Sequence, residues 1–234
     1  MKQPLVVFGG IFFSTALVLV VVLIYQFKGI TDGGKSNGST YQPTPPVVED
    51  VQEEYQLSEL ATPYQKEIFE ELLTAQKEYK TTSTDLTEEE YAAALVKNFI
   101  ADFYTWSNKT GRNDVGGLQF IAEEMRSDFR NQAIDGFYGN LDYYLKDYDA
   151  TTLITVKDVS VLDVNLNDTI QAEVETETEE GTEKTTESVE CISVEANWEY
   201  EVSSLNEITK FQNEATFILT QSGENLVLNA ILAE

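Results

Sequence analysis

The chain has 234 residues, with 15 Lys and Arg against 41 Asp and Glu, and a formal charge of −26. It has no His and one Cys, which excludes Ser-His-Asp and Cys-His catalysis, imidazole metal ligands, an intrachain disulfide and a cysteine-rich zinc site. Such an acidic chain would also repel the phosphate backbone of nucleic acids, which proteins bind through Lys and Arg. The sequence predicts no catalytic residue, metal site or cofactor.

The charge is distributed unevenly along the chain. The first 40 residues carry Lys2, Lys28 and Lys35 against Asp32, a balance of +2. The rest of the chain therefore has 12 basic and 40 acidic side chains, a balance of −28. The basic part surrounds residues 5–27, which contain no charged side chain.

Residues 5–27 are predicted to form a transmembrane helix. An α-helix of this length spans about 34 Å, against a hydrocarbon core of about 30 Å. A cleaved signal peptide is the alternative, but its apolar region usually has about 7–15 residues and ends at small residues. Here the apolar run ends in the bulky Tyr25 and Phe27, which favours an uncleaved anchor. Gly10 and Ser14 form a small-xxx-small pair on which another membrane helix could pack.

This anchor divides the chain into a cytoplasmic tail of residues 1–4 and a large exported part. Basic residues flank the segment on both sides, so the positive-inside rule is nearly balanced. In proteins with an anchor of this kind, the polypeptide after the anchor is usually translocated across the membrane. We therefore expect a single-pass protein of the cell membrane with its C-terminal domain outside the cytoplasm. Residues 28–57, rich in Gly, Ser, Asn and Pro, are predicted to be a linker.

Residues 58–234 are predicted to form an α+β domain, and helices come first. The segment TPYQ at residues 62–65 combines an N-cap, a proline at the first helical position and a capping-box Gln. A second capping box, TEEE at residues 87–90, predicts the start of the next helix. A third helix is expected over about residues 118–134, followed by a short aromatic helical turn near residues 141–149.

After residue 150 the hydrophobic period changes from helical to alternating, which is typical of antiparallel strands. The clearest strand begins at Cys191, which alternation places on the polar face, opposite Ile192. A hairpin is expected around residues 165–168, and a loop over residues 181–187. Helices followed by strands, without alternation, predict about three helices packed on a curved antiparallel sheet of four to five strands.

Three motifs leave alternatives open. The acidic run at residues 173–180 could bind cations or steer charge, but a solvated strand that discourages edge association is favoured. Asp163-x-Asn165-x-Asn167 begins like a calcium loop and lacks the Gly and Glu that such a loop requires, so a hairpin turn is favoured. Residues 116–117, both Gly, could present backbone N–H groups to an anion, or simply lead a loop into a helix.

Aromatic residues supply the candidates for binding. Most of them should form the core, but a curved sheet wrapped on helices could use some to line a pocket or a partner surface. The candidates are Trp106, Tyr138, Tyr144 and Trp198.

The element order resembles a known group. Three helices followed by a strongly curved antiparallel sheet resemble the nuclear transport factor 2-like, or cystatin-like, cone. A short tail, one membrane helix, a linker and such a cone resemble the bitopic assembly subunits of type IV secretion and conjugation machines. Residues 103–121, FYTWSNKTGRNDVGGLQFI, are the motif-like segment.

The resemblance implies a non-catalytic scaffold in a bacterial envelope assembly. Its partners would be the lipid bilayer, through residues 5–27, and other membrane or envelope proteins or further copies of the chain. The alternative is a small-molecule receptor, or an enzyme that uses carboxylates and Tyr inside the cone. An open pocket with convergent polar groups would favour the alternative, whereas an interior packed with Leu, Phe and Trp would favour the scaffold.

Overall fold

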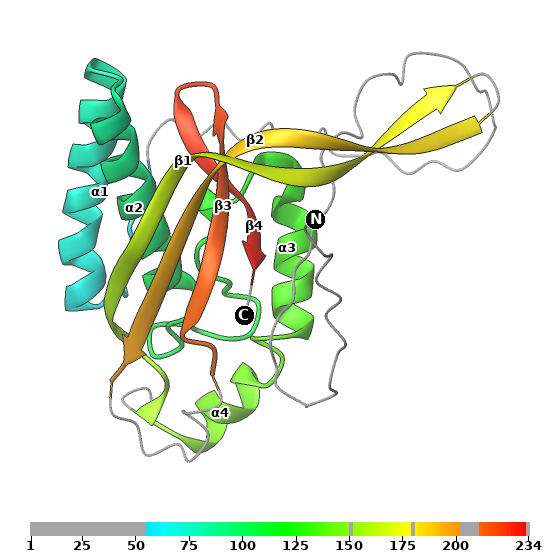
Figure 1. Ribbon diagram of the computed structural model, residues 1–234. Helices are drawn as coiled ribbons and strands as arrows, with labels where there is room; N and C mark the ends of the chain where they lie inside the picture. Colours follow the sequence, from blue (N-terminus) through cyan, green and yellow to red (C-terminus); the bar gives the residue numbers. More distant parts are fainter. Residues whose placement is uncertain (1–54, 150–151, 179–180, 202–210, 233–234) are drawn as a thin grey trace, which may run out of the picture.

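A computed structural model describes residues 55–149, 152–178, 181–201 and 211–232. This part of the chain is α+β, with the helices first and an antiparallel sheet of four strands afterwards, as expected (Figure 1). The predicted membrane segment, with Gly10 and Ser14, lies outside the described residues. No helix among the described residues is long and apolar enough to cross a membrane.

Helix α1 (Pro63–Thr81) begins where the sequence predicts it. Gln65 N–H donates to Thr62 Oγ1 at 3.2 Å, and Gln65 Oε1 accepts from Thr62 N–H at 2.8 Å, which completes the capping box. Helix α2 (Asp85–Phe103) starts earlier than expected, because Thr84 is the N-cap. Thr87, predicted as the cap, is instead the third helical residue, and its N–H and side chain both bond to Thr84.

The expected third helix is divided into two pieces. A 3₁₀ turn, η1 (Leu118–Phe120), precedes α3 (Glu123–Asp135), and α4 (Leu141–Asp147) follows. The division arises because the backbone is extended at Ile121, which forms a parallel bridge with Leu228, and the next amide, that of Ala122, donates to the Leu228 carbonyl at 3.0 Å. Pairing with a strand thus replaces one helical turn.

The sheet has the strand order β1-β2-β3-β4, formed by β1 (Val156–Thr178), β2 (Gly181–Tyr200), β3 (Glu214–Ser222) and β4 (Asn225–Leu232). The hairpin expected at residues 165–168 is wrong, because β1 continues through this segment with a register shift between Asn165 and Asp168. The turn-forming residues therefore produce a bulge rather than a reversal. The loop expected at residues 181–187 is likewise wrong, because it belongs to β2.

β1 and β2 extend beyond the rest of the sheet. β2 pairs with β3 only from Ile192 to Asn197, whereas it pairs with β1 as far as Gly181. The outer halves of the two strands therefore form a two-stranded arm, which Figure 1 shows projecting from the domain. The side chains of the acidic run at residues 173–180 lie outside the described residues.

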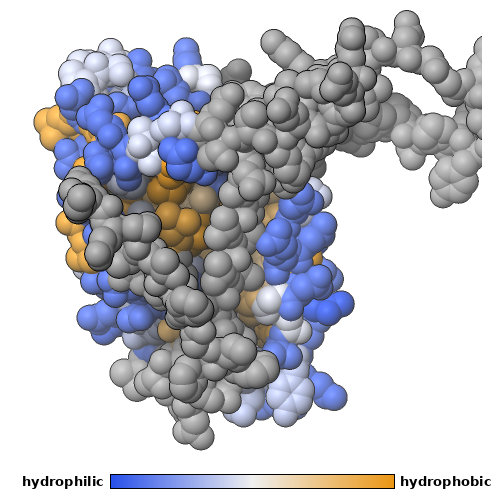
Figure 2. Space-filling view, turned by 45° about the vertical axis from the view of Figure 1, so that its right-hand side comes forward, coloured by the Kyte–Doolittle hydropathy of each residue, from blue (hydrophilic) through white to orange (hydrophobic). Residues whose placement is uncertain are grey.

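α2 is the central helix of the core. It is buried on most sides, because the small side chains of Ala92, Ala94 and Ala101 allow neighbouring elements to pack closely against it. Larger residues such as Phe99 fill the space between α2, the sheet and α3. The Phe99 ring lies 6.0 Å from that of Phe129 on α3 and 5.9 Å from that of Phe217 on β3. Figure 2 shows hydrophobic residues gathered at the centre of one face of the domain, with hydrophilic residues around them.

The predicted position of Cys191 on the polar face is wrong. Cys191 is only 5% exposed, and its neighbours Ile192, Ser193 and Val194 are also buried. Strict alternation fails here because Cys191 pairs with Asp168 at the edge of the β1 bulge. A bulge changes the face of the sheet towards which the neighbouring side chains point.

Cys191 should react slowly with thiol reagents while the protein is folded. Burial raises the pKa of its thiol, and the Asp168 charge raises the pKa further, so the reactive thiolate is scarce until the pH exceeds the ordinary value for a thiol. Titration with a chromogenic disulfide at pH 8 should be at least about tenfold slower than in denaturant. The chain has a single Cys, so equal rates in the two states would directly contradict the buried position.

Candidate functional site

A buried ion pair closes the loop that follows α2. Asp102 Oδ1 accepts a hydrogen bond from Lys109 Nζ at 2.5 Å, and Asp102 Oδ2 accepts one from Gly117 N–H at 2.7 Å. The Lys109 side chain is only 4% exposed and that of Asp102 27%. We call these three residues the Asp102 clamp. It attaches the middle of the loop, at Lys109, and its end, at Gly117, to the last turn of α2, and both loop residues lie in the motif-like segment 103–121.

The Gly116-Gly117 pair has no free backbone donor for an anion. Gly116 N–H donates to Tyr138 Oη at 3.1 Å, and Gly117 N–H donates to Asp102. The pair therefore serves the other predicted purpose, that of leading the loop into a helix. A Cβ at Gly116 would overlap the Asp102 carbonyl oxygen, and Gly117 has a left-handed backbone with φ of 75°. Close packing thus requires glycine at both positions.

Tyr138, a predicted candidate for a binding surface, is part of this closure. It is fully buried, and its hydroxyl donates to the Phe103 carbonyl at 2.6 Å while accepting from Gly116. Burial raises the pKa of the Tyr138 phenol well above its usual value. The side chain therefore stays neutral and links the segment between α3 and α4 to the end of α2.

Trp198 is also a core residue. It is 2% exposed, its ring lies 4.5 Å from that of Tyr104, and its Nε1 donates to Tyr200 Oη at 2.9 Å. Tyr200 Oη in turn donates to the Gln212 carbonyl at 2.7 Å. These contacts tie β2 to the segment before β3 and leave Trp198 no surface for a partner.

Trp106 and Tyr144 are the two predicted candidates that the structure brings together. Their rings lie 5.6 Å apart, and the Trp106 ring is also 5.1 Å from that of Phe137 and 5.3 Å from that of Phe211. Trp106 is 2% exposed, and its buried Nε1 has no hydrogen-bond partner among the described residues. Tyr144 lies over Trp106 and is half-buried.

Two further tyrosines, one on α4 and one at its C-cap, extend this aromatic group to the surface. Tyr143 and Tyr148 are 63% and 43% exposed, and their rings lie 5.9 and 5.8 Å from that of Tyr144. We call Tyr143, Tyr144 and Tyr148 the α4 tyrosine surface. The sequence analysis did not select Tyr143 or Tyr148, because the sequence does not show that α4 ends at Asp147 and that the extended C-cap places Tyr148 beside Tyr144.

Charged residues border the α4 tyrosine surface. Asp142 accepts a hydrogen bond from Arg112 N–H at 2.9 Å, and its other oxygen lies 3.7 Å from Arg112 Nε. A hydrogen bond to Asp147, together with the charge of that residue, raises the pKa of the exposed Tyr143 phenol. The surface is therefore aromatic at its centre and charged at its edge.

The best-defined hollows lie away from the aromatic interior. Among the described residues they have volumes of about 660, 20 and 560 Å³, and none of them is lined by Trp106, Tyr138, Tyr144 or Trp198. The two large ones lie on the outer side of α1 and α2. Within the described part of the chain, no group of three or more acidic or Cys side chains could hold a metal ion.

Comparison of the chain with family models, with curated proteins and with solved structures gave no match.

Replacement of Gly117 tests the closure of the loop. Gly117→Ala adds a Cβ 2.8 Å from the Phe99 ring, whereas Gly223→Ala meets the same left-handed backbone, with φ of 62°, in open space. Because backbone strain is common to both, Gly117→Ala should lower the free energy of unfolding by about 1–3 kcal/mol more than Gly223→Ala. Denaturant unfolding measures both values, and equal losses would show that the contact with Phe99 is unimportant.

Proposed function

We propose that the chain is a membrane-anchored, extracytoplasmic scaffold protein without catalytic activity, and that it binds other envelope proteins. The distribution of the aromatic residues carries this proposal. Inside the domain the rings pack against one another, whereas Tyr143 on α4 and Tyr148 at its C-cap are exposed. A molecule with a filled interior and an aromatic surface is suited to binding a protein rather than a small substrate.

Two features support the proposed envelope location and family resemblance. The uncharged segment at residues 5–27 has the length of a membrane span. Helices followed by an antiparallel meander have the element order of the nuclear transport factor 2-like cone. Together they match the plan of the bitopic assembly subunits of type IV secretion and conjugation machines, and the proposed chain is a component of that kind of bacterial assembly.

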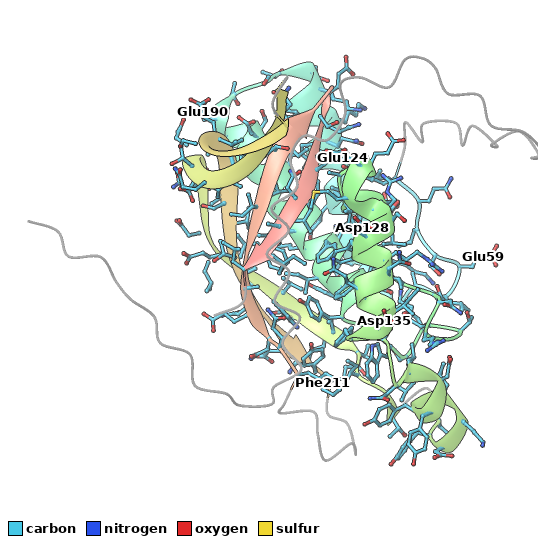
Figure 3. The ribbon with its side chains drawn as sticks, turned by 90° about the vertical axis from the view of Figure 1, so that its right-hand side faces the viewer. Glu59, Glu124, Asp128, Asp135, Glu190 and Phe211 are labelled. Carbon is cyan, nitrogen blue, oxygen red and sulfur yellow. The ribbon has the colours of Figure 1, made fainter. Side chains whose placement is uncertain are left out.

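The α4 tyrosine surface has the chemistry of a protein interface. Tyr and Trp are enriched at interface centres because they bury a large area with few rotatable bonds. Trp106 supports Tyr144 from below, and the Arg112–Asp142 contact supplies a polar edge. The surface also lies at the same end of the domain as Phe211, which Figure 3 shows near α4.

The alternative of a receptor or enzyme is less well supported. It requires convergent polar groups in an open interior, but the best polar candidates are already bonded inside the protein. The hydroxyls of Tyr138 and Tyr200 both donate to backbone carbonyls, and burial raises their pKa values, so neither is a base near neutral pH. Asp102 is likewise engaged by Lys109 and Gly117.

The test uses the full chain, extracted gently from its native membranes. Its complex should sediment as a species larger than the monomer. Tyr143→Ser combined with Tyr148→Ser should weaken this association by about tenfold or more, since exposed tyrosines at interface centres contribute about 1–2 kcal/mol or more. Sedimentation in detergent measures the shift.

The matched control is Leu162→Ser combined with Leu232→Ser. These leucines are 54% and 40% exposed, close to the values for the two tyrosines, but they lie on β1 and β4. The control should leave the complex intact. A wild-type chain that is monomeric in gentle detergent, or equal losses from both pairs of substitutions, would contradict the proposal.

A further inference from the structure

The segment that leads into α1 lies against α2 and η1. Gln119 of η1 holds it by its backbone: Gln56 N–H donates to Gln119 Oε1 at 2.8 Å, and Gln119 Nε2 donates to the Gln56 carbonyl at 2.9 Å. Because both bonds go to the backbone of one residue, the Gln119 amide pairs with it as a neighbouring strand would. We call residues 55–57 the strap. They are the last residues of the expected linker, 28–57.

Tyr55 attaches the beginning of the strap to the core. Its ring lies 5.1 Å from that of Phe120, and its hydroxyl shares a hydrogen bond of 2.6 Å with the Tyr91 hydroxyl. Phe120 and Tyr91 are both buried, whereas Tyr55 is half-buried and packs against the core from outside. The strap is therefore held by one ring contact and three hydrogen bonds.

The rest of the strap packs loosely. Leu57 is 37% exposed, and a hollow of about 20 Å³ remains between the strap and Phe69. Figure 3 shows Glu59, in the turn after the strap, pointing away from the domain. Close packing resumes at Ala61, which is 7% exposed and lies just before α1. The turn at residues 59–60 can therefore serve as a hinge.

The polar groups that hold the strap keep other partners when it leaves. The Tyr91 hydroxyl also bonds to the Gln76 side chain and to the backbone of Leu226, so it remains paired without Tyr55. The bonds of Gln119 lie at the surface, where water replaces them. A buried polar group without a partner is costly, and release of the strap avoids this cost. The main loss is the ring contact of Tyr55.

We propose that the strap is releasable: residues 55–57 detach and reattach while the rest of the domain stays folded, with the turn at residues 59–60 as the hinge. Release would lengthen the connection to the proposed anchor by residues 55–58, about 13 Å when extended. The strap would thus set how far the domain reaches from the membrane. This change in reach rests on the proposed anchor, whereas the release itself does not.

Hydrogen exchange of the full chain in detergent, read at single amides by fragmentation mass spectrometry, tests the release. The Gln56 amide should be protected, yet it should exchange at least about tenfold faster than amides in the middle of α2. Low concentrations of urea should accelerate the α2 amides and leave the Gln56 rate unchanged, because release of the strap exposes little surface.

Two substitutions of Tyr55 separate the ring contact from the hydroxyl. Tyr55→Ala removes the contact with Phe120 but leaves Gln119, the acceptor of the Gln56 amide, in place. It should accelerate exchange at Gln56 by about tenfold or more, because the strap is released more often. Tyr55→Phe keeps the ring and should change this rate by less than about threefold, since Tyr91 keeps its other partners.

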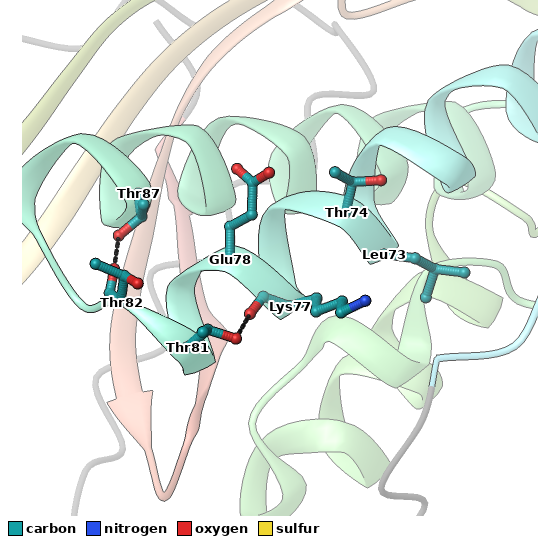
Figure 4. A pocket seen from close by; sticks show the side chains of 7 residues that line it. All are labelled: Leu73, Thr74, Lys77, Glu78, Thr81, Thr82 and Thr87. Atoms are coloured by element: carbon teal, nitrogen blue, oxygen red, sulfur yellow. Dashed lines mark hydrogen bonds between the residues drawn. The ribbon is translucent and has the colours of Figure 1, made fainter.

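Matched controls weaken the body of the domain instead. Ile100→Val, in the buried core of α2, should accelerate the α2 amides by about threefold or more. It should leave Gln56 within about twofold of the wild type, because the body is folded both before and after release. Thr81→Val removes the bond of 2.7 Å from Thr81 Oγ1 to the Lys77 carbonyl, at the far end of α1 (Figure 4). It should likewise leave the Gln56 rate unchanged.

Three results would overturn the proposal. If Gln56 follows the α2 amides in rate and in urea dependence, the strap separates only when the whole domain unfolds. If it exchanges as fast as in an unfolded peptide, the strap is not attached. If Ile100→Val accelerates Gln56 as strongly as Tyr55→Ala does, the release is not local. Failure of the proposed anchor or of the α4 tyrosine surface would alter none of these rates, so the two tests are separate.

Discussion

The carboxylate of Asp102 joins the last turn of α2 to two positions of the loop that follows it. One oxygen accepts from Lys109, seven residues later, and the other from the Gly117 amide, 15 residues later. A buried lysine without its counter-charge would cost about 3–5 kcal/mol, so this contact stabilises the closed loop after α2. Tyr138 then attaches the segment between α3 and α4 to the same loop, through Phe103 and Gly116. The position of α4, and with it the tyrosine surface, depends on this closure.

Under the proposed function, partners bind on the outside of the domain. Phe99 and Phe103 of α2, Phe129 of α3 and Phe217 of β3 fill the space between helices and sheet. Because this interior is packed, the aromatic surface at α4 is the part of the described domain that best fits the proposed binding of a protein partner.

Local patterns predicted much of the fold. The capping box at Thr62 and Gln65 identified the start of α1, and the change from helical to alternating hydrophobicity identified the α+β class. The sequence could not show whether Asn165 to Asp168 reverse the chain or bulge within a strand, because the same polar residues suit both and pairing with β2 decides. The Asp102 clamp was missed for a related reason. One carboxylate among 41 is distinguished only by its buried partner, and the burial of Lys109 is a property of the folded domain that the sequence pattern does not show.

A double-mutant cycle on Asp102→Asn and Lys109→Met tests the central role of the clamp most directly. Unfolding of the full chain in detergent by urea, followed by Trp fluorescence, gives the free energy of unfolding for the wild type, both single variants and the double variant. A coupling energy of about 1–3 kcal/mol is predicted, because each single change leaves the other group without its partner. Additive effects, with a coupling below about 0.5 kcal/mol, would show that the loop and the α4 surface are held by other contacts.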